Sequence, residues 1–290
     1  MFTLPFMFAM LAVAAALAYG VNHSSAAADR LSFQAGAGIP RVQQIAAAWG
    51  RGEFVELAAP EAAVPPAQVD LPILMYHHVR GAGPGDSELT RGLTVDPAAF
   101  ETQLAYLQQQ GYRTVSMRQL YTALYQGEPL PERSVLLTFD DGYADSYAVA
   151  APLLEKYGFS GTFFIVTGLV GSEGYMNWDQ VVELERMGME IGSHTASHPD
   201  LTVLDGGGLE AELAGSAAAL SERLAHPVYW LCYPAGAYNE EVLGRCLPAG
   251  YLLSVTTEPG QTHSSGDPYR LPRWRVGPGT TLEQFAFLVE

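Results

Sequence analysis

The chain has 290 residues, of which 48% are hydrophobic and 16% are charged, enough for one large domain or two modest ones with a substantial core. Disorder, collagen and coiled coil are excluded, because 30 glycines, 19 prolines and 11% aromatic residues follow no short period. The formal charge of −16 argues against a nucleic acid partner held through its phosphates, and it permits a basic substrate.

The first twenty residues are apolar and uncharged, and small residues follow at 24–28. We predict a signal peptide or an N-terminal membrane anchor over residues 1–28. No Lys or Arg precedes the apolar run, so both alternatives stay open. Either one predicts export, with the protein in the periplasm, outside the cell, or anchored to the outer face of the cytoplasmic membrane.

Residues 29–70 are rich in Ala, Gly and Pro, which predicts a spacer with one short helix around Ile45. From residue 71 to residue 290, short apolar runs alternate with amphipathic stretches. The apolar runs predict strands over 71–79, 134–139, 162–167, 189–194, 228–233 and 251–256. The amphipathic stretches predict helices from Asp96 to Gly111, through Tyr147 to Gly158, from Asn177 to Gly188, around Leu213 to Leu224 and after Asn239.

This alternation predicts one α/β domain with a parallel sheet that is covered on both faces or closed into a barrel. The only two cysteines, Cys232 and Cys246, are too few for a disulfide scaffold, and neither has the neighbours of a zinc finger. We interpret them as buried apolar residues, with a disulfide as the alternative.

Polar side chains follow four of the predicted strands. Asp140 and Asp141 follow one, His194 and His198 another, and His77 and His78 a third, while a Gly-containing turn at 233–236 follows the fourth. The carboxyl ends of parallel strands meet at one rim, where α/β folds collect their chemistry.

Two His four residues apart and one carboxylate can supply three ligands to a divalent metal and leave positions open for water and substrate. Zinc suits this set, and an iron oxygenase is the competing interpretation. The second, adjacent Asp favours hydrolysis, because a carboxylate beside the metal can take a proton from water.

The motifs TFDDG at 138–142 and HTASH at 194–198 resemble the first two signature motifs of the polysaccharide deacetylase family, carbohydrate esterase family 4. The resemblance extends over 71–290 and implies a catalytic domain folded as a distorted, incomplete (β/α) barrel.

By this resemblance Asp140 is the catalytic base, and Asp141, His194 and His198 bind one divalent metal. Zinc is our first expectation for that metal, with cobalt, nickel or iron as alternatives.

The third motif departs from the usual family pattern. It contains Tyr233, Pro234 and Ala235 where the family has an aromatic residue in place of Ala, but Ala keeps the backbone N–H that stabilises the oxyanion. The Arg that normally orients the base is missing from this motif. Arg273 is our candidate replacement and Arg270 is the alternative, because a guanidinium can hold a carboxylate through two hydrogen bonds.

The usual C-terminal motif with the general acid is also absent. The MYHHV segment resembles a rearranged branch of the family that includes poly-β-1,6-N-acetylglucosamine deacetylases. That branch implies His77 as the acid that protonates the leaving amine, with His78 facing the other side of the strand. Trp178 either stacks on a sugar or packs at the start of a helix.

We therefore predict metal-dependent removal of N-acetyl groups from an N-acetylated polysaccharide, of the poly-N-acetylglucosamine type, with release of acetate. The alternatives are a peptidoglycan or chitin deacetylase with the same chemistry, and an exported carbohydrate-binding protein with a decayed site. The apolar N-terminal segment also predicts membrane association.

Overall fold

The computed structural model of the chain describes residue 57 and residues 66–290. The signal peptide or anchor predicted over 1–28 and the short helix predicted around Ile45 lie outside the described residues. Within the described part of the chain, no helix is both long enough and apolar enough to cross a membrane.

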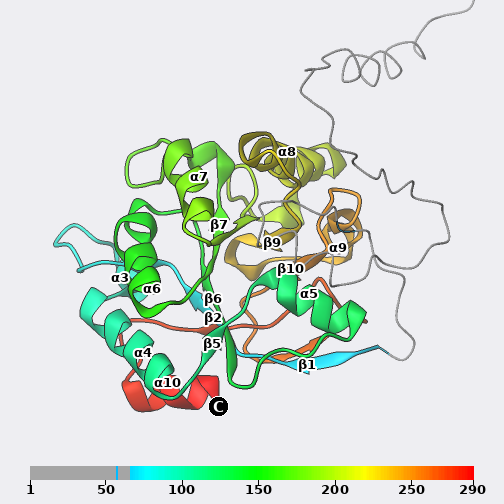
Figure 1. Cartoon of the computed structure of the whole chain (residues 1–290). Coiled ribbons are helices and arrows are strands. Elements are labelled where there is room, and N and C mark those ends of the chain that lie inside the picture. Colours follow the sequence, from blue (N-terminus) through cyan, green and yellow to red (C-terminus); the bar gives the residue numbers. More distant parts are fainter. Residues whose placement is uncertain (1–56, 58–65) are drawn as a thin grey trace, which may run out of the picture. The chain divides into compact units, whose positions relative to one another are not determined.

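Eight strands form one parallel sheet at the centre of the domain (Figure 1). Their order is β10-β9-β8-β7-β6-β2-β12, and β5 also pairs with β6. Their bounds are β2 Ile73–Tyr76, β5 Arg113–Thr114, β6 Ser134–Phe139, β7 Thr162–Ile165, β8 Glu190–Ser193, β9 Trp230–Cys232, β10 Leu253–Val255 and β12 Trp274–Arg275. All six apolar runs form strands of this sheet, although the run predicted over 71–79 contributes only β2, because His78–Val79 pairs in a separate small sheet; β5 and β12 were not predicted.

The segment from Leu271 to Arg275 joins the two ends of this sheet. Leu271 bridges in parallel to Val255 of β10, at one end of the sheet, while Trp274 of β12 pairs with Leu74 of β2, at the other. The sheet therefore curls until a single irregular segment spans the gap between its ends. This arrangement confirms the predicted distorted, incomplete (β/α) barrel.

The side chains of β6 point alternately to the two faces of the sheet. Leu137 and Phe139 belong to the hydrophobic cluster beneath the surrounding helices, whereas Leu136 belongs to a second cluster, on the inner face. Because side chains alternate along a strand, Thr138 and Asp140 share the inner face with Leu136. This parity directs Asp140 toward the interior of the barrel.

The helices surround the sheet (Figure 1). Their bounds are α3 Glu88–Gly92, α4 Pro97–Gln109, α5 Met117–Gln126, α6 Ala151–Tyr157, α7 Trp178–Arg186, α8 Gly206–Leu224, α9 Glu240–Cys246 and α10 Leu282–Val289, and the short helical turns are η1 Ser146–Ala150, η2 Thr167–Leu169, η3 Leu201–Val203 and η4 Pro234–Gly236. The five predicted helices are all present. Asp96 and Asn177 cap α4 and α7 as expected, each through a side chain that accepts a backbone N–H.

Three helices, the short α3 and the longer α5 and α10, were not predicted; the last two share a start signal. Helices α5 and α10 each begin with a capping box, at Ser116 and at Thr281, in which the cap and a Gln three residues later bond each other's backbone. Helix α8 also begins earlier than expected, at Gly206 behind the cap Asp205. Its first three residues are glycines. Because glycine is a poor helix former, the sequence did not indicate that the helix begins there.

The predicted end of the spacer at residue 70 is too late. Strand β1, Gln68–Asp70, pairs in antiparallel fashion with β11, Thr262–Ser264, and so belongs to the folded domain. A second small sheet pairs β3, His78–Val79, with β4, Thr94–Val95. The largely polar β1 carries no apolar pattern, and its partner lies almost two hundred residues away, so local periodicity could not reveal the pairing.

Candidate active site

The strand order explains why the predicted site residues meet. Strands β2, β6, β8 and β9 are parallel members of one curled sheet, with β7 between β6 and β8. The segments that follow these strands therefore lie at the same rim, as the sequence predicted. Three loops supply the metal-ligand candidates, the base candidate and the acid candidate.

Asp141, His194 and His198 come together at this rim. Oδ1 of Asp141 lies 3.1 Å from Nε2 of His194 and 3.4 Å from Nε2 of His198. A tetrahedral ion with ligand bonds of about 2.0 Å holds its ligand atoms roughly 3.3 Å apart. Two imidazoles and one carboxylate at these separations therefore fit a zinc-like ion with open positions for other ligands.

A strained turn presents the Asp141 carboxylate. Asp141 has φ 73° and Gly142 has φ 76°, both in the left-handed region. The positive φ favours Gly at position 142, whereas a Cβ there would meet the side chain of Ile165 only at ordinary contact distance, 3.4 Å. A non-Gly residue in the left-handed region stores strain, which is common at functional sites.

The surroundings of Asp141 favour its ionised form. Burial raises the pKa of this carboxyl, but hydrogen bonds with His194 and His198 outweigh burial and hold the pKa far below its usual range. A metal ligand must be deprotonated, so this environment suits the predicted role.

A second set of metal-ligand types, formed by Asp140, His194 and Cys232, overlaps the first. The guanidinium of Arg273 occupies that region, with Nη2 3.2 Å from Cys232 Sγ and 2.7 Å from Asp140 Oδ2. A divalent cation there would face a buried positive charge, so we assign the metal candidate to the set with Asp141.

Asp140 is held by Arg273 and not by Arg270. Nη1 and Nη2 of Arg273 donate to the two carboxylate oxygens at 2.8 and 2.7 Å, and Nη1 also donates to Thr138 Oγ1 at 2.9 Å. Arg270 instead pairs with Glu240 at 2.7 Å, in a partly exposed position. The structure thus selects one of the two arginines that the sequence left open.

Arg273 also sets the protonation of Asp140. Burial raises the pKa of the Asp140 carboxyl. The charge and hydrogen bonds of Arg273 lower this pKa by a larger amount, so it lies below its usual value. Asp140 is therefore a carboxylate at neutral pH, the form that can accept a proton.

His77 lies beside Asp140, with Nε2 4.0 Å from Oδ2 of the carboxylate. Burial lowers the pKa of His77, although the neighbouring Asp140 partly opposes this effect. The His77 carbonyl accepts a hydrogen bond from Ser146 Oγ at 3.1 Å, which anchors this end of the strand. His78 makes separate contacts, as expected for the opposite side: its Nδ1 lies 2.7 Å from Asp145 Oδ2.

Three neighbouring residues, Tyr233, Pro234 and Ala235, were predicted to supply the backbone N–H that stabilises the oxyanion, and the structure distinguishes between them. The Tyr233 N–H already donates to the Val255 carbonyl at 3.3 Å, and the Tyr233 ring is buried. Pro234 has no N–H. Ala235 is exposed with φ 53°, and its N–H donates to no protein acceptor among the described residues. Of the three residues, only Ala235 offers a free backbone donor.

For Trp178, packing is favoured over sugar stacking. The guanidinium carbon of Arg223 on α8 lies 5.2 Å from the centre of the Trp178 ring. The ring also packs against the outer hydrophobic cluster. These contacts support the packing alternative for Trp178, and its role as a substrate contact stays a prediction.

Several residues near the site were overlooked in the sequence. The Cys232 carbonyl lies 2.7 Å from His194 Nδ1, and its thiol lies 3.4 Å from Asp140 Oδ2. Burial and the neighbouring Asp141 raise the pKa of the Tyr143 hydroxyl, and Asp145 Oδ1 accepts the Val79 N–H at 2.7 Å. Tyr143 and Asp145 directly follow the TFDDG motif, which was the signal available. Cys232 and Cys246 are both free and buried, as interpreted.

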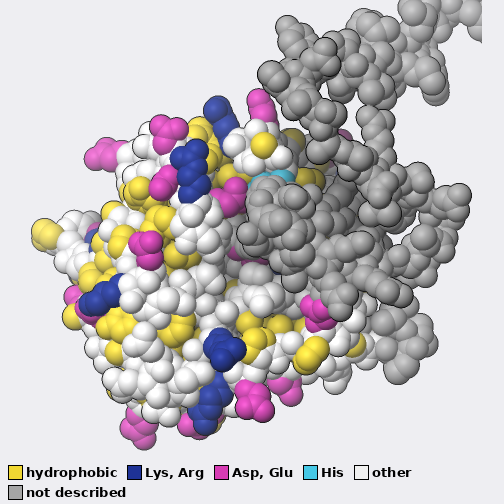
Figure 2. All heavy atoms as spheres, in the orientation of Figure 1, with side chains coloured by type: hydrophobic (Ala, Val, Ile, Leu, Met, Phe, Trp, Pro, Cys, Tyr) yellow, Lys and Arg dark blue, Asp and Glu magenta, His cyan; other side chains and the backbone are white. Residues whose placement is uncertain are grey.

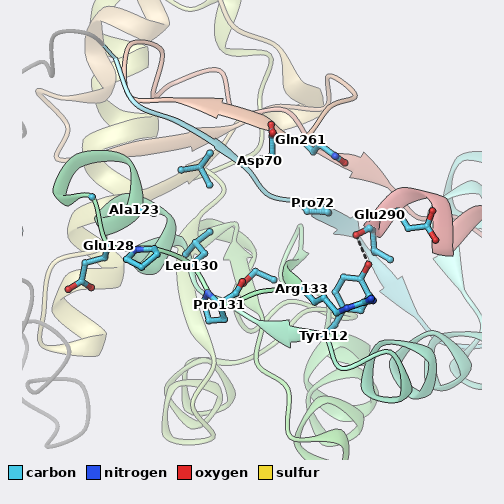
Figure 3. A pocket seen from close by; sticks show the side chains of 15 residues that line it. Asp70, Pro72, Tyr112, Ala123, Glu128, Leu130, Pro131, Arg133, Gln261 and Glu290 are labelled. Atoms are coloured by element: carbon cyan, nitrogen blue, oxygen red, sulfur yellow. Dashed lines mark hydrogen bonds between the residues drawn. The ribbon is translucent and has the colours of Figure 1, made fainter.

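A separate cavity of about 640 Å³ lies at the amino ends of the strands (Figure 3). Pro72, Ser134 and the end of α5 at Gly127 contribute to its lining, together with Arg133 and Glu128. None of the candidate site residues lines this cavity. On the face seen in Figure 2, Asp and Glu side chains are spread over the surface and do not form one acidic patch.

A model of the polysaccharide deacetylase family matches residues 127–253. The chain is 35% identical over 220 residues to the Bacillus subtilis (strain 168) protein YxkH, whose name places it among the polysaccharide deacetylases, with 76% of each chain covered. It is 27% identical over 222 residues to the poly-β-1,6-N-acetyl-D-glucosamine N-deacetylase of Staphylococcus aureus (strain MRSA252), with 69% of this chain and 76% of that protein covered.

Two solved structures share the fold. The Streptococcus pyogenes deacetylase PplD in complex with acetate superposes with a TM-score of 0.72 at 32% identity, over 77% of this chain and 100% of that chain. IcaB from Ammonifex degensii superposes with a TM-score of 0.64 at 27% identity, over 76% of this chain and 97% of that chain.

Proposed function

The chain belongs to the polysaccharide deacetylase family, a family of hydrolases, and on that premise we propose that it removes N-acetyl groups from poly-β-1,6-N-acetylglucosamine in a metal-dependent reaction. The observation that carries the proposal is the cluster of Asp141, His194 and His198 beside an ionised, Arg-held Asp140. Metal-assisted amide hydrolysis needs both a metal-ligand set and a proton acceptor, and here they are neighbours.

In this proposal Asp141, His194 and His198 hold one divalent ion, with zinc as the first choice. The ion supplies Lewis acidity, which polarises the acetyl carbonyl and makes water more acidic. Asp140, kept ionised by Arg273, takes a proton from the attacking water as the new C–O bond forms. The Ala235 N–H donates to the carbonyl oxygen as negative charge develops there.

The C–N bond then breaks, and the leaving nitrogen needs a proton. His77 delivers it in this proposal, and Asp140 then passes the proton taken from the water to His77, whose Nε2 lies 4.0 Å from Asp140 Oδ2, so both side chains return to their starting states. The net change is one water consumed, with acetate and a free amine released.

The choice of polymer draws on the MYHHV segment and on the name of the Staphylococcus aureus relative. A peptidoglycan or chitin deacetylase would use the same chemistry. We further propose that the protein acts outside the cytoplasm and associates with the membrane through residues 1–28, because the first twenty residues are apolar and no Asp, Glu, Lys or Arg occurs before Asp29.

The test is acetate release from β-1,6-linked and β-1,4-linked N-acetylglucosamine oligomers and from peptidoglycan, measured side by side. We expect the fastest release from the β-1,6 substrate, loss of release with a chelator, and recovery with zinc. Asp140→Asn should lower the rate by about a hundredfold or more, because a positioned base contributes roughly 10² to 10⁴. Asp179→Asn, an exposed carboxyl on α7, is the matched control and should be unchanged.

Faster release from the β-1,4 substrate or from peptidoglycan would reject poly-β-1,6-N-acetylglucosamine as the preferred polymer, while the proposed deacetylation chemistry would stand. Sugar binding without turnover under any divalent metal would support the alternative of a decayed carbohydrate-binding protein. Undiminished release by Asp141→Ala would refute the metal assignment.

A further inference from the structure

The loop that carries His198 has a strained backbone, which needs support from neighbouring residues. Thr195 has φ 68° and His198 has φ 60°, so two non-Gly residues within four positions lie in the left-handed region. Such conformations are strained in residues with a Cβ and persist only where the surroundings impose them. One restraint is local: the His198 N–H donates to Thr195 Oγ1 at 3.0 Å.

The two imidazoles of the metal-ligand set are held in different ways. His194 is buried, and its Nδ1 lies 2.7 Å from the Cys232 carbonyl, which fixes the ring and leaves Nε2 for an ion. The His198 side chain is 38% exposed. Its Nδ1 contacts no protein acceptor in the described part of the chain. Apart from the approach of its Nε2 to Asp141 and an edge-to-face contact with the His194 ring at 4.8 Å between centres, the ring of His198 depends on its backbone for its position.

Glu212 of α8 holds that backbone. Its Oε2 accepts the N–H groups of Ala196 and Ser197 at 2.9 and 2.8 Å, and its Oε1 accepts the Ser197 hydroxyl at 2.5 Å. Leu213, the next residue on the helix, is buried in the hydrophobic cluster beneath α8, which anchors this part of the helix. One carboxylate thus connects a packed helix to the two residues that immediately precede His198.

We propose that Glu212 is a positioning residue of the metal site, which sets the affinity for the ion by holding His198 in its ligating position. This inference rests on the proposed function, because it presupposes that the three ligands bind an ion. Hydrogen bonds from N–H groups to a charged acceptor are stronger than neutral ones. Residues that orient metal ligands from outside typically change metal affinity by about 10–100-fold when they are lost.

The test measures zinc affinity directly, by competition between the metal-free protein and a chelating dye. Glu212→Ala should weaken zinc binding by about tenfold or more, because all three contacts are lost. Glu212→Gln should restore most of the affinity, since an amide can accept from the two N–H groups and donate to the Ser197 hydroxyl. Glu210→Ala, an exposed residue on the same helix, is the matched control and should bind zinc as the wild type does.

A second measurement separates positioning from general destabilisation. Thermal unfolding with and without zinc should show that Glu212→Ala loses much of the zinc-induced rise in Tm, while its metal-free Tm stays close to that of the wild type. Ser197→Ala, which removes one contact of the three, should lie between the wild type and Glu212→Ala in zinc affinity.

Zinc affinity unchanged in Glu212→Ala would overturn the proposal, as would an equal loss in Glu210→Ala. A wild-type chain that binds neither zinc nor cobalt would overturn the metal assignment of the proposed function, and the role of Glu212 with it. The two failures are distinguishable, because only the second appears in the wild-type protein.

Discussion

At the scale of single residues, the central feature is a carboxylate that stays charged inside the protein. Asp140 is buried, and an unpaired charge there would be neutralised by uptake of a proton. Arg273 prevents this through two hydrogen bonds with nearly equal lengths, 2.8 and 2.7 Å. The planar guanidinium matches both carboxylate oxygens, which a lysine ammonium cannot do.

Arg273→Lys should therefore impair the reaction and change its pH dependence. With weaker support, burial raises the pKa of Asp140 and less carboxylate is present at low pH. We expect kcat/KM for acetate release to fall by about tenfold or more. The acid limb of its pH profile should move to higher pH.

The matched control is Arg270→Lys, which alters a partly exposed ion pair with Glu240 and should change neither quantity. A loss of activity with an unmoved acid limb would contradict the assigned role of Arg273, because it would indicate damage to packing alone.

At the scale of elements, Glu190 joins strand β8 to helix α5. Its carboxyl accepts the N–H groups of Met117 and Arg118, at 2.7 and 3.2 Å, and the Thr162 hydroxyl at 2.9 Å. Met117 and Arg118 are the first residues of α5, whose N–H groups lack partners within the helix. A side chain distant in sequence thus satisfies the start of a helix that packs against the inner face of the sheet.

Glu190 should make the stability of the protein depend on pH. Burial raises the pKa of its carboxyl above the ordinary value of 4.5, although its hydrogen bonds partly oppose this. Protonation is therefore favoured in the folded state, so the contribution of Glu190 is complete below pH 4.5 and is lost as the pH rises through the folded-state pKa. Relative to Glu190→Gln, the wild type should gain stability as the pH falls from neutrality toward 4.5.

Urea unfolding at a series of pH values measures this difference in the free energy of unfolding. Glu210→Gln, at an exposed position, should show no such trend. A difference between wild type and Glu190→Gln that grows as the pH rises would have the wrong sign and would reject the interpretation.

At the scale of the whole domain, the candidate metal ligands come from segments more than fifty residues apart. Asp141 follows β6, while His194 and His198 follow β8, so their proximity exists only in the folded sheet. A ligand that binds only the folded state stabilises it by mass action, by about 2.7 kcal/mol at a concentration one hundred times its Kd.

Zinc should accordingly raise the Tm of the wild-type protein, with a rise that grows with zinc concentration. Asp141→Ala should remove most of this rise, because it deletes a ligand. An equal rise in Asp141→Ala, measured by differential scanning calorimetry, would show that zinc stabilises the domain elsewhere.

The sequence alone determined the features that depend on near neighbours. Continuous apolar runs identified six of the eight strands of the central sheet, and Asp96 and Asn177 identified helix starts. Two short motifs identified the family and the candidates for base and metal ligands. These signals are local, because side-chain periodicity and capping act over only a few residues.

Only the tertiary structure decided between distant alternatives. It selected Arg273 over Arg270, since the irregular segment that spans the ends of the curled sheet carries Arg273 to Asp140. It also left Ala235 as the free backbone donor and brought Glu212 to the loop of His198. Sheet closure and helix packing bring together residues that are far apart in the chain, and no pattern of neighbouring residues records such contacts.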